Sequence, residues 1–143
     1  MAEFHPKFAV ALVTPDGAVF DGEAEMMVVP GAAGEIGVLA RHAPLVATLQ
    51  AGSTRIYLAP SEILEFATGP GFFKVELDRA LALVDDAVNV KEIDDERARA
   101  QLEAAKAELE RVETGESTAD RWQLEQRIKH AENQLAVSGR TIG

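Results

Sequence analysis

Cysteine is absent from the 143 residues, and long apolar runs are absent as well. Without cysteine the chain has no disulfide framework, no thiolate nucleophile and no zinc site built on sulfur. No uncharged apolar stretch approaches the roughly 20 residues of a membrane-spanning helix. No apolar run follows the acidic start Met1–His5, as a secretory signal would require. We therefore expect a soluble protein of a reducing compartment.

Positive charge is also scarce, because 14 Lys and Arg stand against 24 Asp and Glu and leave a net charge of −10. A surface of this sign repels phosphate groups, so bulk attraction to nucleic acid or to anionic lipid is not expected. The length allows one domain or two very small ones.

Proline, glycine and aromatic residues are present but unevenly spread. All six prolines and eight of the eleven glycines precede residue 72, and Trp122 is the only aromatic residue after Phe73. Segment 89–143 carries 21 charged side chains, whereas the longer segment 1–88 carries 17. Turn formers with β-branched and aromatic residues are typical of strands, and dense mixed charge with alanine and leucine is typical of helices. The composition predicts two domains, 1–88 and 89–143.

Segment 1–88 has the pattern of short strands separated by turns. Apolar and polar residues alternate in several runs, and Pro15-Asp16-Gly17 and Gly69-Pro70-Gly71 mark turns between them. Turn signals every ~8–12 residues are typical of a sandwich or barrel, so we predict an N-terminal antiparallel β-sandwich of about ten strands. The glycine-rich segment 31–37 is interpreted as turns between strands, because no Lys-Ser/Thr follows it and no helix begins there.

Segment 89–143 has a helical period instead. Its apolar residues step by three and four along two stretches, at Ala98, Leu102, Ala105, Leu109 and Val112 and then at Leu124, Ile128, Ala131 and Leu135. Gly115 supplies a stop between them, Ser117 and Asp120 have the spacing of a capping box, and Gly139 is predicted to end the second helix. The short connection predicts a C-terminal antiparallel α-helical hairpin, so the whole is a β plus α chain.

The predicted seam of this hairpin is thin, since three of its nine positions are alanine. At roughly 25 cal/mol per Å² of buried apolar surface, such a pair of helices is only marginally stable alone. We expect the hairpin to be a mobile element.

Catalytic chemistry is not evident in the sequence. His5, His42 and His130 lie in three separate segments without the spacing of metal ligands, so no metal site is expected. No Ser-His-Asp arrangement has a recognisable context. Catalysis by this chain alone is not expected.

The segment at the start of the first helix allows two interpretations. In the first interpretation the segment only begins the helix: Asp94 is a good N-cap, and Ile93 and Ala98 have the spacing of a small hydrophobic staple. This explains every residue of the segment except Arg97. The second interpretation makes Asp94 and Arg97 ligands of a nucleotide, with Arg97 pairing with phosphate oxygens.

Three passages, GEIGVLARHAPL (34–45), GPGFFKV (69–75) and EIDDERARA (92–100), together carry a family resemblance. In them the chain resembles the epsilon subunit of bacterial F-type ATP synthase. The resemblance extends over nearly the whole length and agrees with the family's order of a β-sandwich and a helical hairpin.

This resemblance implies a non-catalytic subunit of the central rotor, which links the membrane c-ring to the catalytic alpha/beta hexamer together with gamma; delta is a further partner. The chain would be peripheral on the cytoplasmic face of the bacterial inner membrane, without direct insertion. The resemblance assigns Glu35 to the loop that faces the c-ring and puts His42 in the same foot of the sandwich. For His42 the alternative is a turn residue that satisfies a backbone group.

The family's hairpin is regulatory, and by resemblance it would inhibit ATP hydrolysis when it extends into the hexamer. Arg121, Arg127 and Lys129 would then meet acidic loops of the catalytic subunits, or else are solvated residues of an amphipathic helix. In some relatives a motif like Ile93, Asp94, Arg97 and Ala98 binds regulatory ATP. Here Val88 stands where ATP binders carry a carboxylate, and Ala104 where they place a second arginine.

A function of another class stays open at this point. The chain would then be a β-sandwich adaptor unrelated to this family, whose helical hairpin binds a helical partner.

Overall fold

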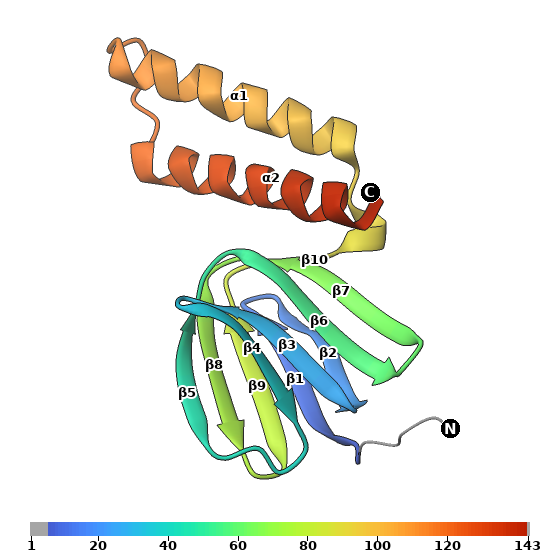
Figure 1. Cartoon of the computed structure of the whole chain (residues 1–143). Helices are drawn as coiled ribbons and strands as arrows, with labels where there is room; N and C mark the ends of the chain where they lie inside the picture. Colours follow the sequence, from blue (N-terminus) through green and yellow to red (C-terminus); the bar gives the residue numbers. More distant parts are fainter. Residues whose placement is uncertain (1–5, 143) are drawn as a thin grey trace. The chain divides into compact units, whose positions relative to one another are not determined.

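The computed structural model describes residues 6–142, the last four of them as helix backbone only. His5 lies outside the described residues. The chain divides into two compact units, one ending at Asn89 and the other beginning at Val90, and Figure 1 shows one built of strands and one of helices. In the described part, no helix is long and apolar enough to cross a membrane.

The first unit is a β-sandwich close to a barrel, as the strand pattern predicts. Its described residues form ten strands, which are β1 (Phe8–Thr14), β2 (Gly17–Ala24), β3 (Met26–Gly31), β4 (Gly34–Leu39), β5 (Leu45–Leu49), β6 (Gly52–Ala59), β7 (Glu62–Thr68), β8 (Gly71–Glu76), β9 (Arg79–Val84) and β10 (Ala87–Asn89). Asn89 still pairs with Phe66 of β7, so the β structure ends one residue beyond segment 1–88.

The strands follow one continuous order, β10-β7-β6-β3-β5-β8-β9-β1-β2, and β4 pairs with β3 beside this path. The last strand of the order, β2, comes back against β6, the third strand from the other end. Strand β3 pairs with two different strands along its length: Met26–Val28 pair with β6, and Gly31 pairs with Leu49 of β5. The sheet therefore folds around one core (Figure 1).

One pair of strands departs from the predicted antiparallel arrangement. Strands β1 and β9 run parallel, with Ala9 opposite Arg79 and Val13 opposite Leu83. Parallel neighbours cannot be joined by a short hairpin. Here most of the β domain lies between them along the chain, so no local turn reveals how they pair.

Strand β4 was expected to be a turn. Its glycines, Gly34 and Gly37, explain the wrong prediction, because glycine weakens a strand and is typical of turns. The structure nevertheless pairs all six residues with β3, from Gly34 opposite Gly31 to Leu39 opposite Met26. Val38 is fully buried in the core, so tertiary packing outweighs the local preference.

The core of the sandwich is largely apolar, and β8 shows clearly how one face of a strand enters it. Phe73 and Val75 of β8 are buried, whereas Phe72, the residue before Phe73, is exposed. Leu12 of β1 and Ile56 of β6 lie in the same core. A period of two directs successive side chains to opposite faces of a strand, so the pattern in the sequence selects the core.

The second unit consists of a short 3₁₀ helix, Val90–Glu92, followed by α1 (Asp95–Glu113) and α2 (Arg121–Ile142). The two long helices pack against each other as an antiparallel hairpin (Figure 1). Asp94 caps α1 as predicted, since its Oδ1 accepts a hydrogen bond from the Arg97 amide at 3.1 Å. Two predicted features of α2 are wrong.

Asp120, and not Ser117, caps α2, because Asp120 Oδ1 accepts hydrogen bonds from the amides of Trp122 and Gln123 at 2.9 and 3.3 Å. Gly139 does not end the helix, which continues to Ile142. A glycine inside a helix costs only about 1 kcal/mol relative to alanine, so it does not force a stop.

Neighbouring phenylalanines of β8 allow a matched test of this core. We expect Phe73→Ala to lower the free energy of unfolding of the full chain by about 3–5 kcal/mol, because it leaves a cavity among packed side chains. Phe73 is 0% exposed and Phe72 is 62% exposed. We therefore expect Phe72→Ala to change the free energy of unfolding by no more than about 0.5 kcal/mol. Chemical denaturation measures both, and equal losses would contradict the assignment of the core face.

Candidate functional site

Glu35 lies beside the turn between β3 and β4, on a tightly constrained piece of backbone. A Cβ atom at Gly31 would lie 2.6 Å from the Gly34 carbonyl oxygen, and Gly34 has a φ of +136° that only glycine adopts readily. The Ala32 amide donates to the Thr48 carbonyl at 2.9 Å, which ties the turn to β5. The two glycines and this hydrogen bond therefore hold Glu35 in a defined place.

The carboxylate of Glu35 is exposed and paired. Its Oε2 accepts a hydrogen bond from Nη2 of Arg55 at 3.1 Å, while 59% of the Glu35 side chain stays accessible. Beside it is an open hollow of about 470 Å³, lined by the turn and by Ala47 and Thr48 of β5. An exposed carboxylate next to a hollow is an arrangement that a protein partner with donor groups can bind.

His42 comes after the far end of β4 from this turn. Glu35 is opposite Pro30, near the turn, whereas His42 follows Leu39, which is opposite Met26. The length of β4 therefore lies between the two residues, and the interface that the resemblance assigns to both stays a prediction.

The geometry of His42 matches its interpretation as a turn residue that satisfies a backbone group. Its Nδ1 is 2.7 Å from the Ala43 carbonyl oxygen, so the ring satisfies a backbone group in the turn. Arg41 before it has a φ of 62°, unusual for a residue with a side chain, and its amide donates to the Leu77 carbonyl at 3.1 Å. A role of His42 at an interface stays a prediction.

The four residues predicted to bind ATP come together at the start of α1, where capping accounts for much of their arrangement. Besides the bond from Arg97, the Asp94 carbonyl accepts from the Ala98 amide at 2.9 Å. Ala98 is buried and Ile93 is half-buried, as a staple requires, and Arg97 is exposed. The capping interpretation therefore explains Asp94 without a ligand, and ATP binding stays a prediction.

Arg121, Arg127 and Lys129, the α2 cations predicted to meet the catalytic subunits, differ in what they contact. Arg121 is engaged twice, with Glu113 of α1 at 3.0 Å and with Glu125 at 3.2 Å. Arg127 and Lys129 are exposed, and neither forms an ion pair with any residue that the structure describes. The hairpin thus leaves two of the three available to a partner.

The end of α1 is closed by a Schellman motif, which satisfies carbonyl groups that a helix end leaves unpaired. The Glu116 amide donates to the Arg111 carbonyl at 2.8 Å, and the Gly115 amide donates to the Val112 carbonyl at 3.2 Å. Gly115 has a φ of +83°, so the predicted glycine stop is confirmed.

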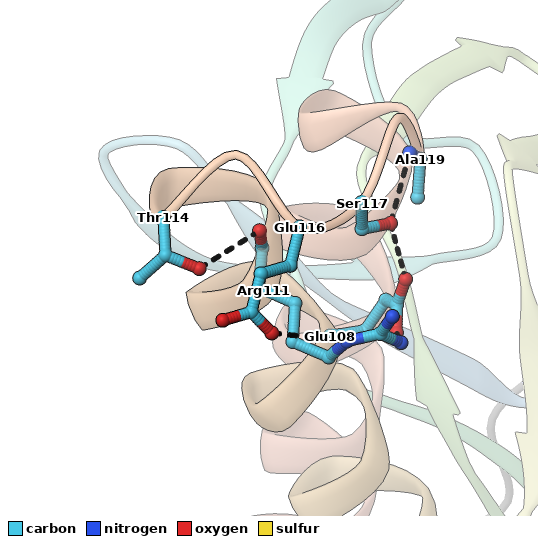
Figure 2. A network of polar contacts seen from close by, with 6 residues as sticks. All are labelled: Glu108, Arg111, Thr114, Glu116, Ser117 and Ala119. Atoms are coloured by element: carbon cyan, nitrogen blue, oxygen red, sulfur yellow. Dashed lines mark hydrogen bonds and ion pairs between the residues drawn. The ribbon is translucent and has the colours of Figure 1, made fainter.

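A polar network that sequence reasoning missed ties the loop back to α1 (Figure 2). Ser117 Oγ donates to Glu108 Oε1 at 2.5 Å and accepts from the Ala119 amide at 3.2 Å. Arg111 pairs with the other carboxylate oxygen of Glu108 at 2.9 Å and lies 4.0 Å from Glu116. Ser117 therefore anchors the loop instead of capping α2, and its partner nine residues away could not be found from local spacing.

The hydrogen bond from Ser117 holds the pKa of Glu108 below its ordinary value, and the charge and hydrogen bond of Arg111 add to this effect. Partial desolvation of the carboxylate acts in the opposite direction. The network is therefore formed with Glu108 ionised.

Comparison with known proteins concerns both units. Residues 7–90 match the family described as ATP synthase, Delta/Epsilon chain, beta-sandwich domain, which is more than half of the chain. The ATP synthase epsilon chain of Persephonella marina is 41% identical over 107 residues, covering 75% of this chain and 79% of that one. The ATP synthase epsilon chain of Halalkalibacterium halodurans is 36% identical over 135 residues, covering 94% and 99%.

Solved structures share the fold. A chain of the Euglena gracilis mitochondrial ATP synthase (OSCP/F1/c-ring) superposes with a TM-score of 0.71 at 23% identity, covering 95% of this chain and 84% of that one. A chain of the central stalk/c-ring of the Tetrahymena thermophila enzyme superposes with a TM-score of 0.55 at 16% identity, covering 99% and 100%.

The loop network makes a pH-dependent prediction. The Glu108 pKa is lowered in the folded state, so its contribution to stability is present above about pH 4.3 and is lost as the pH falls through the folded pKa. We expect Ser117→Ala to speed amide exchange at Ala119 and to lower the thermal midpoint of the hairpin at pH 7. The difference in thermal midpoint between Ser117→Ala and the unmodified chain should become smaller below about pH 4.3.

Thr118→Ala is the matched control, because Thr118 is an exposed neighbour outside the network. Hydrogen exchange and thermal melts of the full chain measure the effect. A difference that stays constant between pH 7 and pH 3 would show that Ser117 acts without the Glu108 charge.

Proposed function

The chain belongs to the ATP synthase epsilon chain family, and we propose that it is a non-catalytic central-stalk subunit of a bacterial F-type ATP synthase. In this role the sandwich docks on the gamma subunit and the c-ring, and couples ion flow through the ring to ATP synthesis in the alpha/beta hexamer. The proposal is supported by a relative that matches across both the sandwich and the hairpin. Family membership removes the alternative of an unrelated adaptor.

The interface toward the c-ring is proposed to include Glu35. The support is its exposure on a constrained turn beside an open hollow. His42 follows the other end of β4, which supports treating the two residues as separate contacts. We assign Glu35 to the ring and leave His42 as a predicted contact of gamma. The delta subunit completes the set of partners in the complex, which holds the chain at the cytoplasmic face of the inner membrane.

The hairpin is proposed to inhibit ATP hydrolysis by leaving its closed form and extending toward the hexamer. The observation that supports this proposal is the composition of the seam. Among the described residues of the two helices, the buried apolar ones are Ala98, Ala105, Leu124, Ala131 and Val137. Three of these five are alanines, which bury little apolar area each, so the packing energy of the closed form is modest. A two-state element needs closed and extended forms of similar free energy.

Removing residues 90–143 tests the inhibitory role. Strand β10 ends at Asn89, so the truncated chain keeps every strand of the sandwich. We expect it to assemble with the complex and to raise ATP hydrolysis by roughly five-fold or more, the lower end of typical coupling energies between sites. Unchanged hydrolysis by a fully assembled complex would sink the inhibitory role while leaving the stalk role intact.

Reversing the charges of Arg127 and Lys129 separates their role from the mere presence of the hairpin. In the double variant Arg127→Glu and Lys129→Glu, repulsion from acidic loops should disfavour the extended form and raise hydrolysis part of the way toward the truncated chain. Lys106→Glu on the exposed side of α1 is the matched control. If the control raises hydrolysis as much as the double variant, the effect follows net charge and not these positions.

A further inference from the structure

Arg55 and Glu35 meet across a strand that belongs to neither of them. Glu35 is in β4 and Arg55 is in β6, and both strands pair with β3. Val28 of β3 is opposite Gly37 on one side and opposite Arg55 on the other. Since Glu35 and Gly37 are two residues apart, they present their side-chain positions to the same face as Arg55. The Arg55 side chain therefore passes over β3 to reach Glu35.

The residue of β4 opposite Val28 is a glycine, Gly37. A Cβ atom at Gly37 would have only the Val28 side chain near it, at 3.9 Å. Val28 beneath is 8% exposed. The Arg55 side chain is 33% exposed, and its Nε is buried with no acceptor among the described residues. Most of the arginine thus lies on the sheet and only its end engages the carboxylate.

The contact orders one oxygen of Glu35 and leaves the rest of the group accessible. Only Oε2 is bonded to Arg55, and more than half of the Glu35 side chain is exposed. A glutamate on an exposed turn otherwise samples several rotamers, and fixing them on association weakens binding by about 2–10-fold. Arg55 fixes the rotamer of Glu35 before the partner binds.

We propose that Arg55 is the positioning residue for Glu35, holding its carboxylate in the orientation that the membrane ring binds; this rests on the proposed stalk function. Arg55 acts through Glu35 and does not itself contact the ring. The opposite effect, competition between Arg55 and donors of the ring for the carboxylate, would make removal of Arg55 strengthen binding. The two effects have different signs, so one titration distinguishes them.

The experiment uses membranes carrying the complex depleted of this subunit, to which the full chain is added back. The half-saturating concentration that restores coupled ion pumping is measured for the unmodified chain, Arg55→Gln, Arg55→Lys, Glu35→Gln and the double variant. We expect Arg55→Gln and Glu35→Gln each to raise the half-saturating concentration by about 2–10-fold. The double variant should be no worse than Glu35→Gln alone, because both act through one contact.

Two controls keep a loss of folding apart from a loss of positioning. Arg79→Gln removes a positive charge from an exposed position of β9 and should leave the titration unchanged. Arg55→Lys keeps the charge but not the planar fork, so it should restore part of the affinity. Thermal melts of the free chain should show Arg55→Gln close to the unmodified protein, because the carboxylate partner of this ion pair is exposed and the glutamine keeps part of the aliphatic stem.

The outcomes separate the two levels of the proposal. Affinity of Arg55→Gln equal to or higher than the unmodified chain, or additive effects in the double variant, would overturn the role of Arg55 while Glu35→Gln still weakens binding. No effect of Glu35→Gln would remove Glu35 from the interface, and Arg55 with it. Failure of the unmodified chain to restore pumping would refute the stalk function itself.

Discussion

Strand β3 is the constraint on which the β domain depends, because it pairs with β6 over Met26–Val28 and with β5 at Gly31. This change of neighbour passes through Pro30-Gly31, where the backbones approach closely. A Cβ atom at Gly52 would lie 2.9 Å from the Pro30 side chain, and one at Gly31 would meet Gly34. The absence of these side chains lets β3 join the two parts of the sheet, and it also sets the position of the turn that carries Glu35.

The helical unit follows a different principle, since its ends are more firmly defined than its seam. Asp94, Gly115 and Asp120 satisfy the backbone groups at three helix ends. The loop adds the contact of Ser117 with Glu108 (Figure 2). Polar contacts of this kind depend on local backbone geometry, whereas the alanines of the seam bury little apolar area each.

How far the sequence alone predicts this protein depends on the range of the interaction involved. The cap of α1 was predicted at its observed residue, Asp94, because capping is a local property. Strand β4 was missed because two glycines resemble a turn until β3 is beside them. Ser117 was misassigned because its spacing to Asp120 resembles a capping box, while its partner lies in the preceding helix.

The sequence by itself determined the division into a strand-forming and a helix-forming part, the apolar faces of the two helices, and the helix ends at Asp94 and Gly115. These follow from periodicity, composition and hydrogen bonds over a few residues, which act before any tertiary contact forms. Only the tertiary structure decided that Glu35 is held by Arg55, that His42 lies apart from it, and that Arg121 is already engaged with Glu113. Each of these depends on which strands or helices become neighbours, and a separation of 20 residues between Glu35 and Arg55 leaves no local pattern to reveal it.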